Sequence, residues 1–208
     1  MPRLILASRN VHKAKEIATI LGNQFTVQTL ANFPAAPEVV EDGETFAANA
    51  VKKAVEIAAW LNGQALGQAR PDLVLADDSG LAVDALGGEP GVRSARYAGD
   101  EGNAPDTANN AKLLHKMDGI PERQRGAQFQ CVLALIALGQ AAQATMFDGI
   151  CRGTIARAQT GKGGFGYDPL FIPEGHTESF AELGPVVKNE ISHRARALAK
   201  LAEHFIEG

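Results

Sequence analysis

Two adjacent acidic residues, Asp77 and Asp78, follow the short apolar run of residues 73–76 and precede Ser79 and Gly80. The run predicts a buried strand, and two carboxylates at its end repel each other and lose hydration unless a counter-ion is present. Mg²⁺ would relieve that repulsion, and where phosphates are bound it needs only one or two protein carboxylates. The residues alone leave two interpretations open: a metal-binding pair, or a solvated turn in which the carboxylates act as caps.

Three further acidic residues precede a predicted helix and could complete such a metal site. Glu41, Asp42 and Glu44 lie just ahead of Thr45, which is a suitable N-cap for a helix that continues to Leu61. One of these carboxylates beside the acidic pair would be enough for a magnesium ion that also binds substrate phosphates.

A polar loop near the start of the chain is a candidate for binding an anion. It follows the apolar run of residues 4–7, precedes a predicted helix that ends at Gly22, and consists of Ser8, Arg9, Asn10, Val11, His12 and Lys13. A strand that opens into a helix in this way directs backbone N–H groups and the positive end of the helix dipole at a ligand, and Lys13 adds a full charge. The loop matches neither GxxxxGK[ST] nor GxGxxG, so an ordinary turn remains an alternative.

A glycine-rich segment, residues 161–169, contains two aromatic residues and an acidic one. Its glycines permit close approach of the backbone to a ligand, Phe165 and Tyr167 offer flat faces for stacking, and Asp168 could accept hydrogen bonds. The alternative is a glycine-rich turn whose aromatic side chains belong to the core.

Basic residues gather where the final helix is predicted to begin. The apolar spacing predicts this helix over residues 189–206, and Lys188, Ser192, His193 and Arg194 lie at its start. Cations at a helix N-terminus oppose the helix dipole, so the cluster indicates an anionic or carbonyl-bearing ligand; a solvated helix start is the alternative.

Two other kinds of hydrolytic site fit the sequence poorly. Asp-Ser-Gly also occurs in aspartic proteases, but those need a second copy or a symmetric dimer and an all-β architecture, and the sequence holds no second Asp-Ser/Thr-Gly. Ser79 lies in no GxSxG motif, and no sequence argument places His193 as its base.

Bulk composition sets broad limits on the class of protein. Of the 208 residues, 45% are hydrophobic and 21% are charged, which predicts a folded domain with a sizeable core. A net charge of −4 argues against a broad nucleic-acid-binding face, so any bound polyanion should be small. Cys131 and Cys151 form no CxxC motif, and the N-terminal apolar stretch is too short for a signal peptide or a membrane span. We therefore expect a cytoplasmic, unanchored protein with two buried thiols.

The order of the predicted elements indicates an α/β fold. Residues 107–117 form a further predicted helix, and residues 128–138 and 144–150 form two strands of a hairpin with its turn near Gln140. Strands that alternate with helices early in the chain, followed by a hairpin, predict a mixed central sheet flanked by helices. The length predicts one large, two-lobed domain over residues 1–208.

Taken in order, five motifs of this chain resemble those of the inosine triphosphate pyrophosphatase family, also called HAM1 or RdgB-like non-canonical purine nucleoside triphosphatases. The motifs are residues 7–13, residues 41–46 with Asn49, Ala50, Lys53 and Ala54, residues 76–81 with residues 94–97, residues 163–169, and residues 191–194. Together they span nearly the whole chain. In the first motif, many members carry Thr-Gly-Asn where this chain has Ser8, Arg9 and Asn10.

The resemblance implies Mg²⁺-dependent hydrolysis of ITP, dITP and XTP to the nucleoside monophosphate and pyrophosphate, which removes these nucleotides from the pool. It also implies a homodimer of elongated, two-lobed α/β subunits, each with a central cleft, and no nucleic-acid or membrane partner. A non-hydrolytic regulatory protein that binds purine nucleotides is the alternative hypothesis, and it predicts binding that does not depend on Asp78.

The same resemblance implies roles for individual residues. Asp78 is implied as the general base and a metal ligand, Glu41 as the other metal ligand, and Asp77 as their support. The implied triphosphate-binding residues are Ser8, Arg9, Asn10, Val11, His12, Lys13, Lys53 and Ser79. The implied base-binding residues are Phe165, Gly166, Tyr167, Asp168, Lys188, His193 and Arg194.

Overall fold

A mixed β-sheet with helices around it is the framework of the computed structural model, which describes residues 1–64, 73–99, 102–139 and 143–207. Within these ranges six strands lie in the order β2-β1-β3-β4-β5-β6. The strands are β1 (Arg3–Leu6), β2 (Thr26–Thr29), β3 (Leu73–Val83), β4 (Gly126–Ala137), β5 (Thr145–Ile155) and β6 (Phe171–Pro173), and the α-helices are α1 (Val11–Leu21), α2 (Phe46–Asn62), α3 (Asp106–Lys116), α4 (Phe180–Ile191) and α5 (His193–Glu207). Strand β1 pairs in parallel with β2 and β3, whereas β5 and β6 are antiparallel. The expected α/β class with a mixed sheet is confirmed.

The chain forms two compact units. The first comprises Met1–Asp78, Cys131–Asp148 and Ala197–Gly208, and the second comprises Ser79–Gln130 and Gly149–Arg196. Strands β3, β4 and β5 are long enough to contribute residues to both units. The single two-lobed domain with a central cleft, expected from the sequence, stays a prediction.

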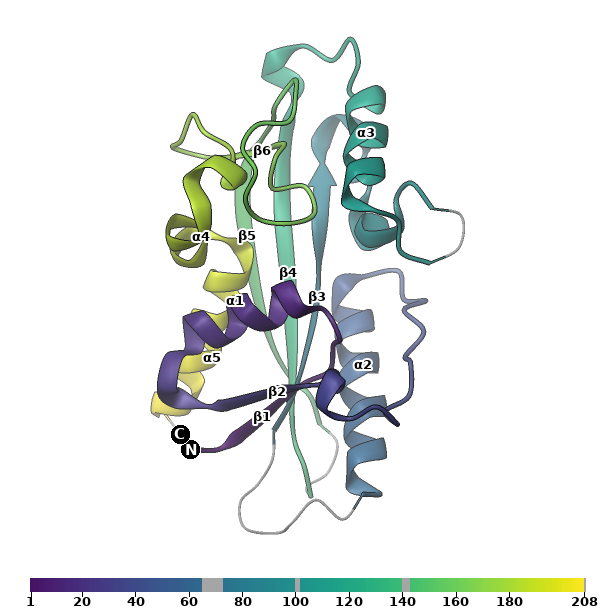
Figure 1. Ribbon diagram of the computed structural model, residues 1–208, viewed down its shortest axis with the longest axis vertical. Helices are drawn as coiled ribbons and strands as arrows, with labels where there is room; N and C mark the ends of the chain where they lie inside the picture. Colours follow the sequence, from purple (N-terminus) through teal and green to yellow (C-terminus); the bar gives the residue numbers. More distant parts are fainter. Residues whose placement is uncertain (65–72, 100–101, 140–142, 208) are drawn as a thin grey trace. The chain divides into compact units, whose positions relative to one another are not determined.

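In the first unit, alternate residues of the strands face two different helical layers. Leu4 and Leu75 point into a cluster with Ile17 of α1 and with the C-terminal part of α5. Ile5 and Val74 point into a second cluster formed with α2. Figure 1 shows α2 on one side of β1 and β3, and α1 on the other. Successive side chains of a strand leave opposite faces, so both faces of this sheet are buried.

The helices of the first unit begin and end where their capping residues predict. The hydroxyl of Thr45 accepts a hydrogen bond of 3.1 Å from the N–H of Ala48 at the start of α2. Gly22 follows the last residue of α1 with a φ of 54°, a conformation that favours glycine. Both helix boundaries confirm the expectation from the sequence.

The second unit has its own core, which fixes the C-terminal part of β3. Leu81 packs with Phe129, Phe171 and other apolar side chains of this unit, and its N–H donates a hydrogen bond of 2.9 Å to Ser94 Oγ. A Cβ on Gly80 would lie only 2.3 Å from that same oxygen. Glycine is therefore required at position 80 for the strand to approach this hydroxyl.

Two boundaries predicted from the sequence are wrong. The strand expected to end at residue 76 continues to Val83, so Asp77, Asp78 and Ser79 lie within β3 and not in a turn. The helix expected over residues 189–206 is two helices, because Ser192 adopts an extended conformation with φ −67° and ψ 162°.

Some elements of the structure differ from the elements that the sequence predicts. Helix α4 was not predicted, since Gly184, with a φ of 77°, and Pro185 interrupt its pattern. The short strands β2 and β6 were also not predicted. The expected hairpin turn near Gln140 lies outside the described residues, although β4 and β5 are neighbours in the sheet as expected.

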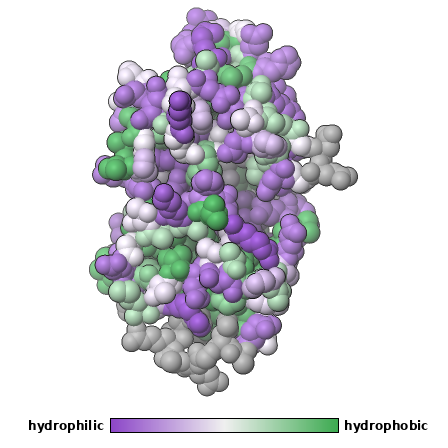
Figure 2. Space-filling model, viewed as in Figure 1, coloured by the Kyte–Doolittle hydropathy of each residue, from purple (hydrophilic) through white to green (hydrophobic). Residues whose placement is uncertain are grey.

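Hydrophilic side chains predominate on the face of the molecule drawn in Figure 2, where hydrophobic side chains occur in small scattered groups. Among the helices of the described ranges, none combines the length and the apolar character needed to cross a bilayer.

Candidate active site

Asn10 organises the polar loop between β1 and α1. Its side-chain oxygen caps α1 by accepting hydrogen bonds from the N–H groups of His12 (2.9 Å) and Lys13 (3.0 Å), and its own N–H donates to Ser8 Oγ at 3.1 Å. The loop therefore has the strand-to-helix geometry expected of an anion site. Because Asn10 already accepts from two amides of the first turn, a bound anion would have to displace its side chain to use them.

The remaining residues of this loop point in different directions. Arg9 donates a hydrogen bond of 2.7 Å from its guanidinium to the carbonyl of Ala36, so its side chain fastens the loop to another segment of the first unit. Val11 is 68% exposed. The substrate contacts expected of all six residues of this loop stay predictions.

Asp77 is buried on the face of β3 that meets α1. Its Oδ1 forms an ion pair of 2.6 Å with Lys13 Nζ, and its Oδ2 accepts a hydrogen bond of 3.4 Å from the thiol of Cys131. The backbone carbonyl of Asp77 also accepts from Lys53 Nζ at 2.9 Å. Asp77 therefore holds Lys13 in a defined position at the end of the polar loop.

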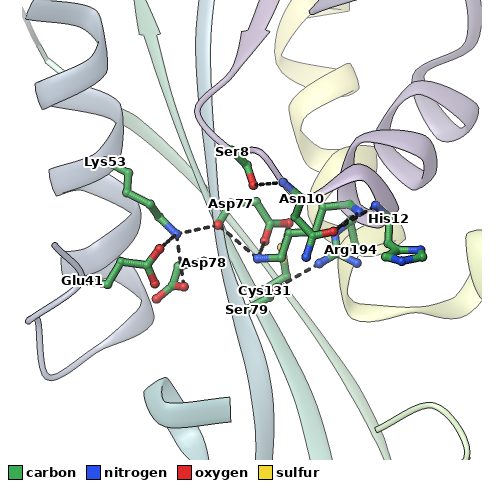
Figure 3. Close-up of polar contacts among 11 residues, drawn as sticks. Ser8, Asn10, His12, Glu41, Lys53, Asp77, Asp78, Ser79, Cys131 and Arg194 are labelled. Atoms are coloured by element: carbon green, nitrogen blue, oxygen red, sulfur yellow. Dashed lines mark hydrogen bonds and ion pairs between the residues drawn. The ribbon is translucent and has the colours of Figure 1, made fainter. Parts of the chain in front are cut away.

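Asp78 leaves the opposite face of β3 and meets α2. Its Oδ1 lies 3.3 Å from Lys53 Nζ, and the same ammonium lies 2.9 Å from Glu41 Oε1 (Figure 3). The two neighbouring aspartates thus have separate lysine partners, because successive residues of a strand point to opposite faces. The repulsion expected between them is avoided by the pleat and by these two cations.

Glu41 and Asp78 have the chemistry of a small magnesium site. Oδ2 of Asp78 is buried and accepts no hydrogen bond of ordinary length from a described residue, although the side chain of Asn49 acts to lower the pKa of this carboxyl. The Glu41 side chain is 34% exposed. Within the described residues no group of three or more His, Cys, Asp or Glu could hold a metal ion. Two carboxylate residues suffice when substrate phosphates and water supply the other ligands, so this pair fits Mg²⁺.

The structure distinguishes the three acidic residues that precede α2. Asp42 pairs with Lys52 at 2.6 Å on the surface, and its side chain is 66% exposed. Glu44 is exposed as well. Glu41 alone of the three is placed beside Lys53 and Asp78 in this part of the described structure.

The buried charged groups shift one another's pKa values. Burial raises the pKa of Asp78 above its ordinary value, and the attraction of Lys53 and Lys13 only partly opposes this. Burial lowers the pKa of Lys53, but the charges of Asp78 and Glu41 outweigh it, so the net pKa is raised. Lys53 therefore stays cationic at neutral pH, and Asp78 is a stronger base than an exposed aspartate.

In the second unit, Asp168 shapes the glycine-rich segment. Its Oδ2 accepts a hydrogen bond of 2.8 Å from the N–H of Phe165 and forms a buried ion pair of 2.5 Å with Lys188 Nζ. A Cβ on Gly164, whose φ is 73°, would lie 2.1 Å from that oxygen. The Phe165 ring, half-buried, has Lys188 Nζ 4.4 Å from its centroid.

The start of α5 contributes two further buried side chains to this unit. Arg194 donates a hydrogen bond of 2.9 Å to Ser79 Oγ, and its guanidinium carbon lies 5.8 Å from the centroid of the Phe165 ring. The His193 ring stacks on Phe129 at 4.7 Å with an interplanar angle of 12°. His193 and Arg194 lie at a helix start as predicted, whereas Lys188 lies in the last turn of α4, where the helix dipole favours a cation.

Tyr167 belongs to the core of the second unit. It is 3% exposed, and its hydroxyl donates a hydrogen bond of 2.8 Å to the carbonyl of Ser94. Burial raises the pKa of this phenol, so it stays neutral. Of the two aromatic residues expected to offer a stacking face, Phe165 is half-buried and Tyr167 is buried. A contact of either ring with a ligand stays a prediction.

Comparison with known proteins shows which proteins this chain is similar to. A family model described as the Ham1 family matches residues 4–204. A protein named dITP/XTP pyrophosphatase from Shouchella clausii is 46% identical over 100% of this chain and 98% of its own length. One of the same name from Geobacter sulfurreducens is 49% identical over 99% of this chain and 97% of its own length.

Solved structures with a similar fold also cover nearly the whole chain. A HAM1 protein from Coxiella burnetii has a TM-score of 0.83 and 37% identity, with 100% of each chain covered. The Ham1 protein of Staphylococcus aureus has a TM-score of 0.80 and 36% identity, with 99% of this chain and 98% of that chain covered.

Proposed function

This chain belongs to the Ham1 family, and on that premise we propose that it hydrolyses non-canonical purine nucleoside triphosphates, among them dITP, ITP and XTP, to the monophosphate and pyrophosphate. The enzyme class, a nucleoside triphosphate pyrophosphatase, rests on the full-length relatives that are named dITP/XTP pyrophosphatases. Removal of such nucleotides from the pool is the role we propose for the reaction.

The observation that carries this proposal is the ion-pair network around Asp78 in the first unit. A buried carboxylate with a raised pKa has one oxygen on Lys53 and the other without a hydrogen bond of ordinary length among the described residues. In the proposed reaction Asp78 accepts a proton from the water that attacks the α-phosphorus. Lys13 and Lys53 neutralise the charge that develops on the phosphate oxygens and on the departing pyrophosphate.

Glu41 and Asp78 are the residues we propose to hold Mg²⁺. When bound, the ion would supply electrostatic stabilisation to the phosphate oxygens. Lys53 joins these two carboxylates in the structure, so its ammonium keeps them close together before a substrate arrives. Ser8 to Lys13 and Ser79 are proposed to bind the triphosphate.

Phe165, Lys188, His193 and Arg194 are proposed to bind the purine base, together with Gly166, Tyr167 and Asp168. Hypoxanthine and xanthine carry an O6 acceptor where adenine carries an amino donor. Cationic donors such as Arg194 would therefore pair with the first two bases and would leave the third unpaired. The hydrogen bond of Arg194 to Ser79 Oγ and its contact with the Phe165 ring support this proposed role.

We propose a homodimer in solution, as the family resemblance implies. We also propose that the protein works in the cytoplasm, where the free thiols Cys131 and Cys151 would stay reduced.

The proposed reaction predicts its products. Incubation of the protein with dITP and Mg²⁺ should yield dIMP and pyrophosphate in equal amounts, measured by ion-exchange chromatography, with much slower cleavage of dATP. Release of dIDP with orthophosphate would contradict cleavage at the α-phosphorus. Saturable binding of dITP without any product would favour the non-hydrolytic regulatory protein.

The metal assignment predicts a difference between neighbouring acidic residues. Chelation of divalent ions should abolish turnover, and added Mg²⁺ should restore it. Glu41→Gln should raise the Mg²⁺ concentration for half-maximal rate by at least about tenfold, because it removes one of two protein ligands. Asp42→Asn is the matched control, since the Asp42 carboxylate pairs with Lys52 on the surface. An equal shift in both variants would contradict the assignment of Glu41.

A further inference from the structure

Two side chains of helix α3 form hydrogen bonds with the peptide groups on both sides of Gly166. The N–H of Gly166 donates a hydrogen bond of 2.6 Å to Asp106 Oδ2, and the carbonyl of Gly166 accepts one of 2.9 Å from Asn110 Nδ2. Asp106 and Asn110 are four residues apart and therefore lie on the same face of α3. This pair of contacts joins the helix to the glycine-rich segment, which runs alongside α3 in Figure 1.

Phe165 is consequently held from two directions. Its own N–H donates to Asp168 Oδ2 at 2.8 Å, and the next residue is fixed by Asp106 and Asn110. Gly166 has a φ of 61°, a left-handed conformation that a turn of this kind requires and that neighbouring hydrogen bonds must maintain. Loss of the contact with α3 would release the peptide next to the aromatic ring.

The stability of the folded protein does not explain why an amide side chain occupies position 110. The residue is 2% exposed, and its Oδ1 accepts no hydrogen bond from any described residue, so half of the buried amide is unsatisfied. An apolar side chain of similar size would avoid the desolvation cost of Oδ1, although it would leave the carbonyl of Gly166 without this donor. The amide therefore makes one useful contact, with Gly166, at a position where packing alone would favour leucine.

The preceding residue, Asn109, is a natural contrast. It is also 2% exposed, but both ends of its amide are satisfied: Oδ1 accepts from the N–H of Ala98 at 2.8 Å, and Nδ2 donates to the carbonyls of Ala95 (3.2 Å) and Ala104 (3.3 Å). Asn109 thus stabilises a different loop of the same unit, and among the described residues its side chain forms no hydrogen bond with the glycine-rich segment.

We propose that Asn110, supported by Asp106, is a positioning residue that sets the conformation of the glycine-rich segment and thereby the affinity for the purine base. The proposal rests on the proposed function for its ligand, because Phe165 is the side chain assigned to stack on that base. It predicts an effect on base binding without an effect on the binding of pyrophosphate, because Lys13, Lys53 and the other proposed phosphate ligands, apart from Ser79, lie in the first unit.

Asn110→Leu should raise the KM for dITP about tenfold, change kcat by less than about threefold, and weaken dIMP binding by about the same factor as KM. The inhibition constant for pyrophosphate should not change. Asn109→Leu should lower the melting temperature more than Asn110→Leu does and leave the KM of the folded protein unchanged. An unaltered KM in Asn110→Leu, or an equal rise in both variants, would overturn the proposal.

A measurement that does not depend on turnover separates this inference from the proposed function. Amide hydrogen exchange in residues 163–168 should be faster in Asn110→Leu than in the unsubstituted protein, and should be unchanged in Asn109→Leu. If the unsubstituted protein fails to hydrolyse dITP, the proposed function fails, and faster exchange still supports the positioning role. Equal exchange in the unsubstituted protein and Asn110→Leu overturns it.

Discussion

Asp78→Asn is expected to lower kcat for dITP by at least about 10³-fold while leaving the protein no less stable at pH 7. The carboxylate is the proposed proton acceptor, and one of its oxygens is buried without a hydrogen bond of ordinary length from the described residues. Asparagine keeps the size and shape of the side chain but can neither accept the proton of the attacking water nor hold Mg²⁺ with a charged oxygen. Steady-state release of pyrophosphate measures the loss.

The stability part of this prediction follows from the protonation of Asp78. Burial raises its pKa above the ordinary 3.8, although Lys53 and Lys13 act in the opposite direction. A carboxyl group whose pKa is higher in the folded than in the unfolded protein contributes its full stability at low pH, and that contribution is lost as the pH rises through the folded pKa. At pH 7 the melting temperature of Asp78→Asn should therefore equal or exceed that of the unsubstituted protein. The difference should close as the pH falls toward 3.8.

Asp84→Asn is a control for which the change in stability at pH 7 is expected to have the opposite sign. A hydrogen bond from Arg152 lowers the pKa of Asp84, whose carboxylate lies 2.7 Å from the guanidinium on the surface. Its contribution to stability is present above the ordinary pKa and is lost as the pH falls through the folded pKa. Asp84→Asn should therefore be slightly less stable at pH 7 and fully active. Near-normal turnover by Asp78→Asn would reject the assigned base, and a joint loss of activity and stability would point to a structural role instead.

Helices with a cap and a continuous apolar face could be predicted from the sequence, because those signals are local. Thr45 and Gly22 mark the boundaries of α2 and α1 as the pattern indicates. Helix α4 could not be predicted, since Gly184 and Pro185 break its periodicity. Its place depends on Phe180, which packs on Phe171 at 5.4 Å in the core of the second unit, and no local pattern contains that contact.

The candidate site was predictable in its residue types but not in its pairings. The sequence places an acidic pair after an apolar run, but the expected end of the strand at residue 76 concealed that Asp77 and Asp78 leave opposite faces of β3. Only a strand that continues through both residues gives each its own lysine. Asn110 had no signal in the sequence, because one amide on an amphipathic helix is ordinary until its contact with Gly166 is seen.

Lys53→Met is expected to lower kcat for dITP by at least about 10²-fold and to reduce the free energy of unfolding by about 3 kcal/mol at pH 7. The ammonium of Lys53 lies 2.9 Å from Glu41 Oε1 and 3.3 Å from Asp78 Oδ1, and its side chain is 9% exposed. Methionine fills a similar volume, so the change removes the charge and leaves two carboxylates without their shared cation. Pyrophosphate release and chemical denaturation measure the two effects.

Lys52→Met is the matched control for this change, because Lys52 is adjacent in α2 but pairs with Asp42 on the surface. It should stay active and lose little stability, since exposed ion pairs contribute little. In Lys53→Met, the pKa of Asp78 should rise further, so the stability lost at pH 7 should return as the pH is lowered and the carboxyls become protonated.

Combination of Lys53→Met with Asp78→Asn provides the decisive comparison. The double variant should be more stable than the sum of the two single changes predicts, because the asparagine removes one of the charges that Lys53 neutralises. Additive losses would show that Lys53 and Asp78 act independently, and would refute the network on which the proposed reaction depends.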